Sequence, residues 1–236
     1  MNTRPKTPAP SLSAQALEAR VLYRDGLVLI IDKPAGLPVH KGPGGGPTLD
    51  DGLDALRFGL PKRPQLGHRL DRDTSGCLVL GRHAKALRRL GRLFSQGRVQ
   101  KTYWALVEGT LSEARGRIDL ALKKRSTAAR GWWMETAQDG QAAITDYRLM
   151  GAGDGISWLE LAPKTGRTHQ IRVHLAAIGH PIIGDPVYGK GQGPMQLHAR
   201  AISLPLYENK PPVSATAPPP PHMRAALRAC GWHDQH

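Results

Sequence analysis

The segment 68–76, HRLDRDTSG, interleaves two carboxylates with two arginines. Arginines beside a carboxylate favour its ionised form, and a carboxylate nucleophile or base must be ionised at neutral pH. Asp71 is therefore a candidate for nucleophilic or acid–base chemistry. The residues alone fit a second interpretation equally well, namely a loop held by ion pairs in which Asp71 or Asp73 caps a turn.

A second polar segment, KTGRTHQIRVHL at 164–175, combines arginine, histidine and apolar residues. On a helix, Arg172 borders the apolar stripe that begins at Ile171, so its side chain is placed to reach a buried carboxylate. The rigid fork of arginine suits that task, because it pairs with a carboxylate through two parallel hydrogen bonds. Arg167 and His169, in the same segment, are candidate substrate contacts.

The third segment, KTYW at 101–104, has the pattern of a strand. Successive side chains of a strand point to opposite faces, so at most one of Tyr103 and Trp104 faces a site. An aromatic ring on a half-buried strand belongs more often to the core than to a base-stacking surface.

The charge balance favours a polyanionic partner. The chain of 236 residues has 33 Lys and Arg against 19 Asp and Glu, a formal net charge of +14. Nucleic acid is the first candidate, although charge alone does not separate DNA, RNA and anionic lipid, and a basic surface also serves solubility. Aromatic residues make up only 5%, which argues against a stacking platform of many rings.

Composition narrows the class of protein further. No apolar run approaches the roughly 18 residues of a membrane span, and the N-terminus MNTRPKTPAPS has no apolar stretch of the secretory type. Two cysteines are too few for a disulfide framework, so we expect a cytoplasmic protein. The glycines lack the spacing that cradles phosphates, and His169 and His174 are poorly spaced for one metal. We therefore expect neither a cofactor nor a metal.

The elements that must position these residues are mostly strands. We expect strands at 27–31, 77–80, 99–108, 143–149, 156–161 and 196–204, and helices at 48–56, from 84 onward and at 167–178 with Gly179 as a stop. The proline-rich segment after residue 210 should be extended. Strands and helices do not alternate strictly, so the expected class is α+β, with a mixed, largely antiparallel sheet flanked by helices.

The helix expected after residue 84 has one basic side. Ala84, Leu87, Leu90 and Phe94 recur at helical spacing and make the expected inner face. Basic residues occupy or flank the other faces: Arg82, Lys85, Arg88, Arg89, Arg92 and Arg98. Any one of them fits a solvated surface, but the run without an acid favours phosphate contact.

Five motifs in a fixed order carry a resemblance to a known family. They are DKPAGLPVH at 32–40, HRLDRDTSG at 68–76, KTYWALVEG at 101–109, GRTHQIRVHLAAIGHPIIGD at 166–185 and QLHA at 196–199. From about residue 21 to 220 the chain resembles the RluA-like group of RNA pseudouridine synthases. The resemblance implies the pseudouridine synthase fold, a long bent mixed sheet with flanking helices.

The resemblance also implies roles for individual residues. Asp71 matches the essential aspartate, and Arg69 matches the arginine that enters the RNA as the target base leaves. Tyr103 matches the tyrosine that stacks near the base, Arg172 the basic partner of the aspartate, and Leu197 an apolar contact near the uracil.

The expected organisation is a flexible tail at 1–20 followed by one catalytic domain at 21–236. Many relatives have an additional N-terminal RNA-binding domain, and we expect no separate one here. The implied activity is isomerisation of uridines in ribosomal or transfer RNA, by a monomer without an obligate protein partner.

Several alternatives stay open at this level. A carboxylate can attack the sugar carbon or carbon-6 of the uracil, or it can abstract a sugar proton. The chain can also be an RNA-binding module without activity. Finally, Asp71 and Asp73 can serve as the carboxylate pair of a nucleoside or glycoside hydrolase.

Overall fold

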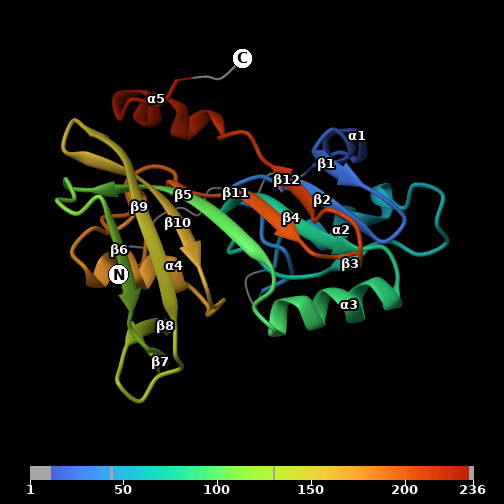
Figure 1. Cartoon of the computed structure of the whole chain (residues 1–236), viewed down its shortest axis with the longest axis horizontal. Helices are drawn as coiled ribbons and strands as arrows, with labels where there is room; N and C mark the ends of the chain where they lie inside the picture. The colour runs from blue at the N-terminus through green and yellow to red at the C-terminus, as the bar shows by residue number, and fades with distance from the viewer. Residues whose placement is uncertain (1–11, 43–44, 130, 234–236) are drawn as a thin grey trace. The chain divides into compact units, whose positions relative to one another are not determined.

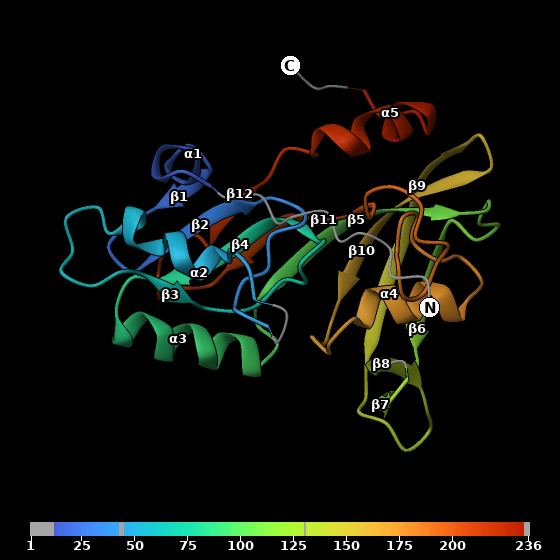
Figure 2. The same ribbon diagram turned by 180° about the vertical axis from the view of Figure 1, so that it is seen from behind.

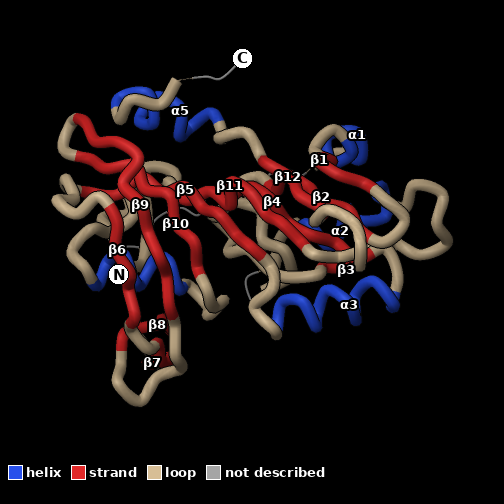
Figure 3. Tube along the Cα trace, in the orientation of Figure 1, coloured by secondary structure: helices blue, strands red, loops and turns tan. Residues whose placement is uncertain are grey.

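The computed structural model describes residues 12–42, 45–129 and 131–233. The chain forms two compact units (Figure 1). Unit one comprises residues 1–98 and 203–217, and unit two comprises residues 99–202 and 218–236. Both units contain strands with helices beside them, and unit two has the larger share of strand (Figure 3).

Unit one is organised around two buried strands. Strand order is β1-β2-β4, antiparallel throughout, and β3 pairs with β4. Seven-residue β4 is buried at every position, and β2 at all but one, because both are short apolar runs. The strands are β1 (Val21–Arg24), β2 (Val28–Lys33), β3 (Gln65–Leu66), β4 (Ser75–Gly81) and β12 (Val213–Thr216).

The helices of unit one include two expected ones. Residues 49–56 form α2 (Leu49–Gly52) followed by a 3-10 turn (Leu53–Leu56). The carboxylate of Asp51 accepts hydrogen bonds from the amide and the hydroxyl of Thr48, both 2.9 Å, so Thr48 does begin the helix. Residues 14–18, placed in an unstructured tail by the sequence analysis, form α1 (Ala14–Glu18), in which Leu17 is buried. Residues 1–11 of that tail lie outside the described residues.

Helix α3 (Ala84–Ser95; Figure 2) confirms the expected helix. Its inner face differs from the expected one. The buried residues are Ala86, Leu90 and Leu93, and Ala84 is exposed. His83 is the N-cap residue, its Nδ1 accepting from the amide of Ala86 at 3.3 Å. Ala84 is therefore the first helical residue and lies off the face that packs on β4.

Unit two holds a sheet in the order β11-β5-β10-β9-β6 and a separate hairpin. The four strands expected here are confirmed, while β6 and the hairpin strands were not expected. The bounds are β5 (Gln100–Glu108), β6 (Arg115–Asp119), β9 (Ile144–Gly153), β10 (Ile156–Pro163) and β11 (Leu197–Leu204). The hairpin, β7 (Leu122–Thr127) and β8 (Gly131–Thr136), extends beyond the ends of β9 and β10 (Figures 1 and 2).

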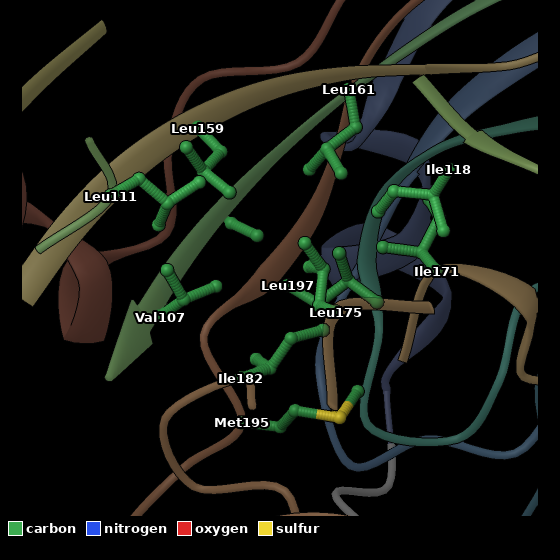
Figure 4. Packing of buried hydrophobic residues seen from close by; sticks show 11 residues of the cluster. Val107, Leu111, Ile118, Leu159, Leu161, Ile171, Leu175, Ile182, Met195 and Leu197 are labelled. Carbon is green, nitrogen blue, oxygen red and sulfur yellow. The ribbon is translucent and has the colours of Figure 1, made fainter. Parts of the chain in front are cut away.

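Alternation along β5 separates the core of unit two into two clusters. Trp104 and Leu106 pack with Trp158 and with residues of the C-terminal helix. Ala105 and Val107 point the other way, into a cluster that includes Leu175 and Leu197 (Figure 4). Tyr103 packs against this second cluster, so Tyr103 and Trp104 face opposite sides, as expected.

Helix α4 (Gln170–Ala177) begins three residues later than expected. His169 has φ +54°, in the left-handed region, so it ends a turn instead of continuing a helix. The side chain of Gln170 holds that turn, since its Oε1 accepts from the hydroxyl of Thr165 (2.6 Å) and from the amide of Arg167 (3.0 Å). Gly179, with φ +85°, follows the helix end as predicted.

Helix α5 (Pro221–Ala229) corrects the expectation of an extended C-terminal segment. Its first residue is the last of the four prolines, a position at which the missing N–H costs no helical hydrogen bond. The turn after α5 lies so close to β9 that a Cβ at Gly151 would be 1.9 Å from the carbonyl oxygen of Cys230. Only glycine fits there.

The class expected from the sequence is confirmed, because the chain is α+β. The strand pairs β1·β2, β2·β4, β3·β4, β5·β10, β9·β10, β6·β9 and β7·β8 are antiparallel. The single catalytic domain at 21–236 stays a prediction.

Candidate active site

Asp71 lies in the loop that leads into the buried strand β4 of unit one. Its side chain is half-buried, and its carbonyl accepts from the amide of Thr74 at 3.2 Å, which closes a tight turn. Gly76 follows with φ +104°, a conformation that side chains disfavour. The turn and the start of β4 together fix where Asp71 stands.

A buried lysine anchors this loop from β2. Nζ of Lys33 donates to three carbonyl oxygens, those of Pro34 (2.8 Å), Leu37 (2.9 Å) and Arg72 (2.9 Å). Burial lowers the pKa of Lys33 to about 7, although the charges of Asp73 and Asp71 favour the ammonium. Because Arg72 adjoins Asp71 in the chain, Lys33 ties the end of β2 to the backbone beside Asp71.

Lys33 is a residue of this site that was not predicted from the sequence. The sequence shows a lysine at the end of an apolar strand, which could have drawn attention to it. Nothing in the sequence shows that this lysine is fully buried.

Among the other charged residues of the loop, two pair with each other and one is exposed. Arg72 and Asp73 form a two-pronged ion pair, Nε to Oδ1 at 2.9 Å and Nη2 to Oδ2 at 3.0 Å. Asp73 is thus held within the loop, while Arg69 is exposed. His68 is held by β4, its Nε2 accepting from the amide of Val79 at 3.1 Å.

In unit two, Arg172 forms a buried, two-pronged ion pair with Asp185. Nε lies 2.7 Å from Oδ2 and Nη2 lies 2.8 Å from Oδ1, and the side chains are 6% and 0% exposed. Burial alone would raise the pKa of Asp185, but the hydrogen bonds and charge of Arg172 lower it below its ordinary value. Asp185 is therefore a carboxylate at neutral pH.

Asp185 was not predicted as this partner from the sequence, where Arg172 was expected to pair with Asp71. The available signal was Asp185 itself, the last residue of the motif at 166–185. Since Asp71 and Arg172 lie in different units, their pairing stays a prediction.

Tyr103 and Leu197 come together in unit two. Leu197 at the start of β11 is buried in the same cluster as Leu161 and Ile171, and half-buried Tyr103 packs against that cluster. Ile171 immediately precedes Arg172. The structure thus gathers an aromatic ring and apolar side chains from β5, β10, β11 and α4.

His169 lies between two rings. Its Nδ1 is 2.8 Å from the hydroxyl of Tyr188, and its ring stacks on Trp132 with centroids 5.0 Å apart and planes at 27°. Trp132 belongs to the hairpin and is 48% exposed, with Nζ of Lys124 5.2 Å from its ring centre. The arrangement brings a cation and a partly exposed aromatic ring next to α4.

Arg167 is exposed, but its Nε donates to the carbonyl of Ala142 at 3.1 Å. It therefore also secures the turn before α4.

The basic face of α3 is smaller than expected. Lys85, Arg88 and Arg92 are exposed. Arg82, in contrast, donates to the carbonyls of Asp25 (2.6 Å) and Arg57 (3.1 Å), so its role is structural. Within the described part of the chain, no helix has the length and apolar character needed to cross a membrane.

Comparisons with known proteins agree on one family. A family model described as RNA pseudouridylate synthase matches residues 27–177. The chain is 45% identical over 209 residues to an uncharacterized RNA pseudouridine synthase of Zymomonas mobilis, covering 86% of this chain and 95% of that protein. It is 40% identical over 185 residues to ribosomal large subunit pseudouridine synthase D of Nitrosomonas europaea, covering 76% of this chain and 52% of that one.

Solved structures show the same likeness. Human RNA pseudouridylate synthase domain containing 4 superposes with a TM-score of 0.77 at 26% identity, over 92% of this chain and 94% of that one. Human RNA pseudouridylate synthase domain containing 1 gives a TM-score of 0.72 at 31% identity, over 89% and 86%.

Proposed function

The chain belongs to the RNA pseudouridylate synthase family, and we propose that it isomerises uridines of structured ribosomal or transfer RNA with Asp71 as the catalytic nucleophile. Members of this family are isomerases that act on RNA. The relative from Nitrosomonas europaea is named for the large ribosomal subunit, which supports ribosomal RNA as one substrate class.

The reaction exchanges one bond for another without a net redox change. The bond between the ribose C1′ and uracil N1 breaks, the base turns, and C1′ bonds to C5. The proton on C5 leaves and N1 gains one. A carboxylate assists by attacking C1′, by attacking C6 of the ring, or by removing a ribose proton, and Asp71 is the group assigned to that step.

The observation that carries the proposal is the anchoring of the Asp71 loop. Lys33 reaches the carbonyl of Arg72 from β2 at 2.9 Å, and β4 begins four residues after Asp71. A nucleophile must be held in place to react, because alignment supplies much of the rate. Half-burial also keeps Asp71 accessible to a base that has left its stack.

Unit two supplies the groups that we assign to the uracil and to the charge of Asp71. Tyr103 stacks near the base, and Leu197 packs against it. We assign Arg172 as the cation that pairs with Asp71 during the reaction. The support for these roles is the cluster in which Tyr103 and Leu197 pack with Ile171, the residue that precedes Arg172 in α4.

RNA contacts are assigned to basic and aromatic side chains that are at least partly exposed. Arg69 enters the space left by the target base, and Arg167 and His169 contact the flanking RNA. The net charge of +14 and the exposed ring of Trp132 support binding to unpaired RNA through phosphate contacts and stacking. We expect a monomer that acts in the cytoplasm without a protein partner.

Site-resolved mapping of pseudouridine in total RNA, from cells with and without this protein, tests the proposal. Some sites should be pseudouridine only in cells that have the protein. These sites should be converted from uridine to pseudouridine when purified enzyme is added to RNA from the deficient cells. The Asp71→Asn variant should restore none of them. Release of free uracil in place of pseudouridine would instead identify a hydrolase.

A further inference from the structure

Two residues beside Arg172 have no role in the reaction described so far. We infer that Asp185 and Tyr188 are positioning residues, which set the direction in which the Arg172 guanidinium points during pseudouridine formation. The inference rests on the proposed function, because it concerns the same active site.

Asp185 is fully buried, and its carboxylate is saturated with hydrogen bonds. Oδ2 accepts from Nε of Arg172 at 2.7 Å. Oδ1 accepts from Nη2 of Arg172 (2.8 Å) and from the amides of Val187 (2.8 Å) and Tyr188 (3.1 Å). A carboxylate fixed by two backbone amides cannot turn, so it presents a rigid receptor to the arginine.

The pairing uses one specific edge of the guanidinium. An arginine has five N–H groups in a planar fork, and Asp185 takes two of them, on Nε and Nη2. The remaining three, including both on Nη1, point along other directions of the same plane. Fixing the Nε edge therefore fixes the direction of the end formed by Nη1 and Nη2.

Tyr188 constrains Arg172 in a second way. The Cζ atom of Arg172 lies 5.1 Å from the centre of the Tyr188 ring. The ring packs on the guanidinium, while the amide of the same residue holds Asp185. Asp185 thus restrains Arg172 at one edge and Tyr188 restrains it at a face.

The hydroxyl of Tyr188 connects this arrangement to the hairpin. It accepts from the amide of Met134 in β8 at 2.9 Å, and it lies 2.8 Å from Nδ1 of His169. His169 in turn stacks on Trp132 of the same hairpin. The placement of Arg172 is therefore linked, through the side chains of Tyr188 and His169, to the exposed ring of Trp132.

A purely structural role of Asp185 predicts a different effect of its substitution. In that case Asp185 would serve only to hold α4 against residues 182–188, and its loss would lower stability without acting through Arg172. A double-mutant cycle separates the two roles, because a residue that acts through Arg172 loses its effect on turnover once Arg172 is altered.

The experiment measures single-turnover rates and KM on an unmodified RNA that the wild-type enzyme isomerises. Asp185→Asn should lower the rate on the order of 100-fold, since a small misplacement of a catalytic group has that effect, with KM within about threefold. Added to Arg172→Lys, the same substitution should cost less than about threefold more. An equal loss in both backgrounds, or no loss in either, would overturn the inference.

The variant Tyr188→Phe tests the inference even if Asp185→Asn fails to fold. Tyr188→Phe removes one oxygen atom and keeps the ring and the amide, so it should fold even if Asp185→Asn does not. It should lower the rate roughly 3- to 10-fold, as expected for lost hydrogen bonds, and again only when Arg172 is intact. A full rate in Tyr188→Phe, with Asp185→Asn unfolded, would contradict the inference.

The matched control is Asp146→Asn, which removes an ion-pair carboxylate of the same unit on the side of Arg117 and Lys164. Its rate should equal that of the wild type, and a comparable loss would contradict a role specific to Asp185. Wild-type enzyme that forms no pseudouridine would refute the proposed function itself, whereas active wild type with fully active Asp185→Asn would refute only the positioning role.

Discussion

Arg172 and Asp185 meet edge to edge inside unit two, with Nε 2.7 Å from Oδ2 and Nη2 2.8 Å from Oδ1. Neither side chain is more than 6% exposed. A buried pair of this kind is held by its own complementarity, because each charge would be costly without the other. Arg172 is therefore a structural element of α4, whatever part it takes in the reaction.

Asp71→Asn should abolish turnover. The amide keeps the shape of the carboxylate but lacks its negative charge, so bond breaking at the ribose loses its assistance while RNA binding largely persists. Pseudouridine formation and RNA affinity, measured on one stem-loop substrate, check both statements. Appreciable turnover by Asp71→Asn would contradict the mechanism.

Asp73→Asn is the matched variant from the same loop and should be milder. Its carboxylate is already paired with Arg72 at 2.9 Å, so the substitution alters the loop surface and not the reacting group. A loss equal to that of Asp71→Asn would mean that the two roles have been assigned to the wrong aspartates.

Arg172→Met should lower both turnover and stability. It leaves Asp185 buried without its cation, and breaking a buried pair costs about 3–5 kcal/mol. Arg172→Lys keeps the charge but not the fork, so its melting temperature and turnover should fall between those of the wild type and Arg172→Met. Equal melting temperatures of the wild type and Arg172→Met would show that the ion pair does not stabilise the fold.

The sequence allowed the class of fold, most strands and the identity of the candidate residues to be predicted, because these depend on local patterns. It did not reveal that Arg172 pairs with Asp185, since the alignment of two side chains 13 residues apart depends on how α4 and the following turn pack. The predicted start of α4 was wrong for a similar reason. Gln170 bonds to the preceding turn, which holds His169 in a left-handed conformation that its residue type does not specify.

Stability should fall as the pH drops from 7.5 to 5.5, and His174 should account for part of that fall. Burial lowers the pKa of His174 below 6.5, and its two ring nitrogens contact the hydroxyl of Thr145 (3.0 Å) and the carbonyl of Leu120 (2.9 Å). In the unfolded chain the imidazole takes up a proton near pH 6.5, whereas in the fold it stays neutral to lower pH. The unfolded state thus binds more protons, and the free energy of unfolding decreases with falling pH.

Urea denaturation of the wild type and His174→Gln at both pH values checks this prediction. The variant should be less stable at pH 7.5 and should show a weaker pH dependence. Some dependence should persist, because burial also lowers the pKa of His222. The same pH dependence in the wild type and His174→Gln would exclude His174 as its source.

RNA affinity should decrease steeply with salt, and the basic face of α3 should contribute to the slope. Each phosphate neutralised on a single strand contributes roughly −0.7 to the log–log slope. Replacing Lys85, Arg88 and Arg92 by glutamine should flatten the slope and leave the rate at saturating RNA unchanged. Arg82→Gln should instead lower the melting temperature, because Arg82 bonds to backbone carbonyls. An unchanged slope in the triple variant would place the RNA elsewhere.

Arg69→Ala should be far more damaging on a structured stem-loop than on a short unstructured RNA with the same target uridine. A uridine in folded RNA is stacked, and taking it out of the stack costs a few kcal/mol. Arg69 is exposed two residues before Asp71, so its planar guanidinium is placed to fill the space that the base leaves. In an unstructured RNA there is no such space, and the arginine has little to contribute.

Arg72→Ala provides the control, because it removes an arginine from the same loop together with the ion pair to Asp73. A loop-level disturbance should lower the single-turnover rate alike on both RNAs. The ratio of the two rates should therefore stay near the wild-type value for Arg72→Ala and fall sharply for Arg69→Ala. A uniform loss on both substrates by Arg69→Ala would remove its role in base extraction and leave it a structural arginine.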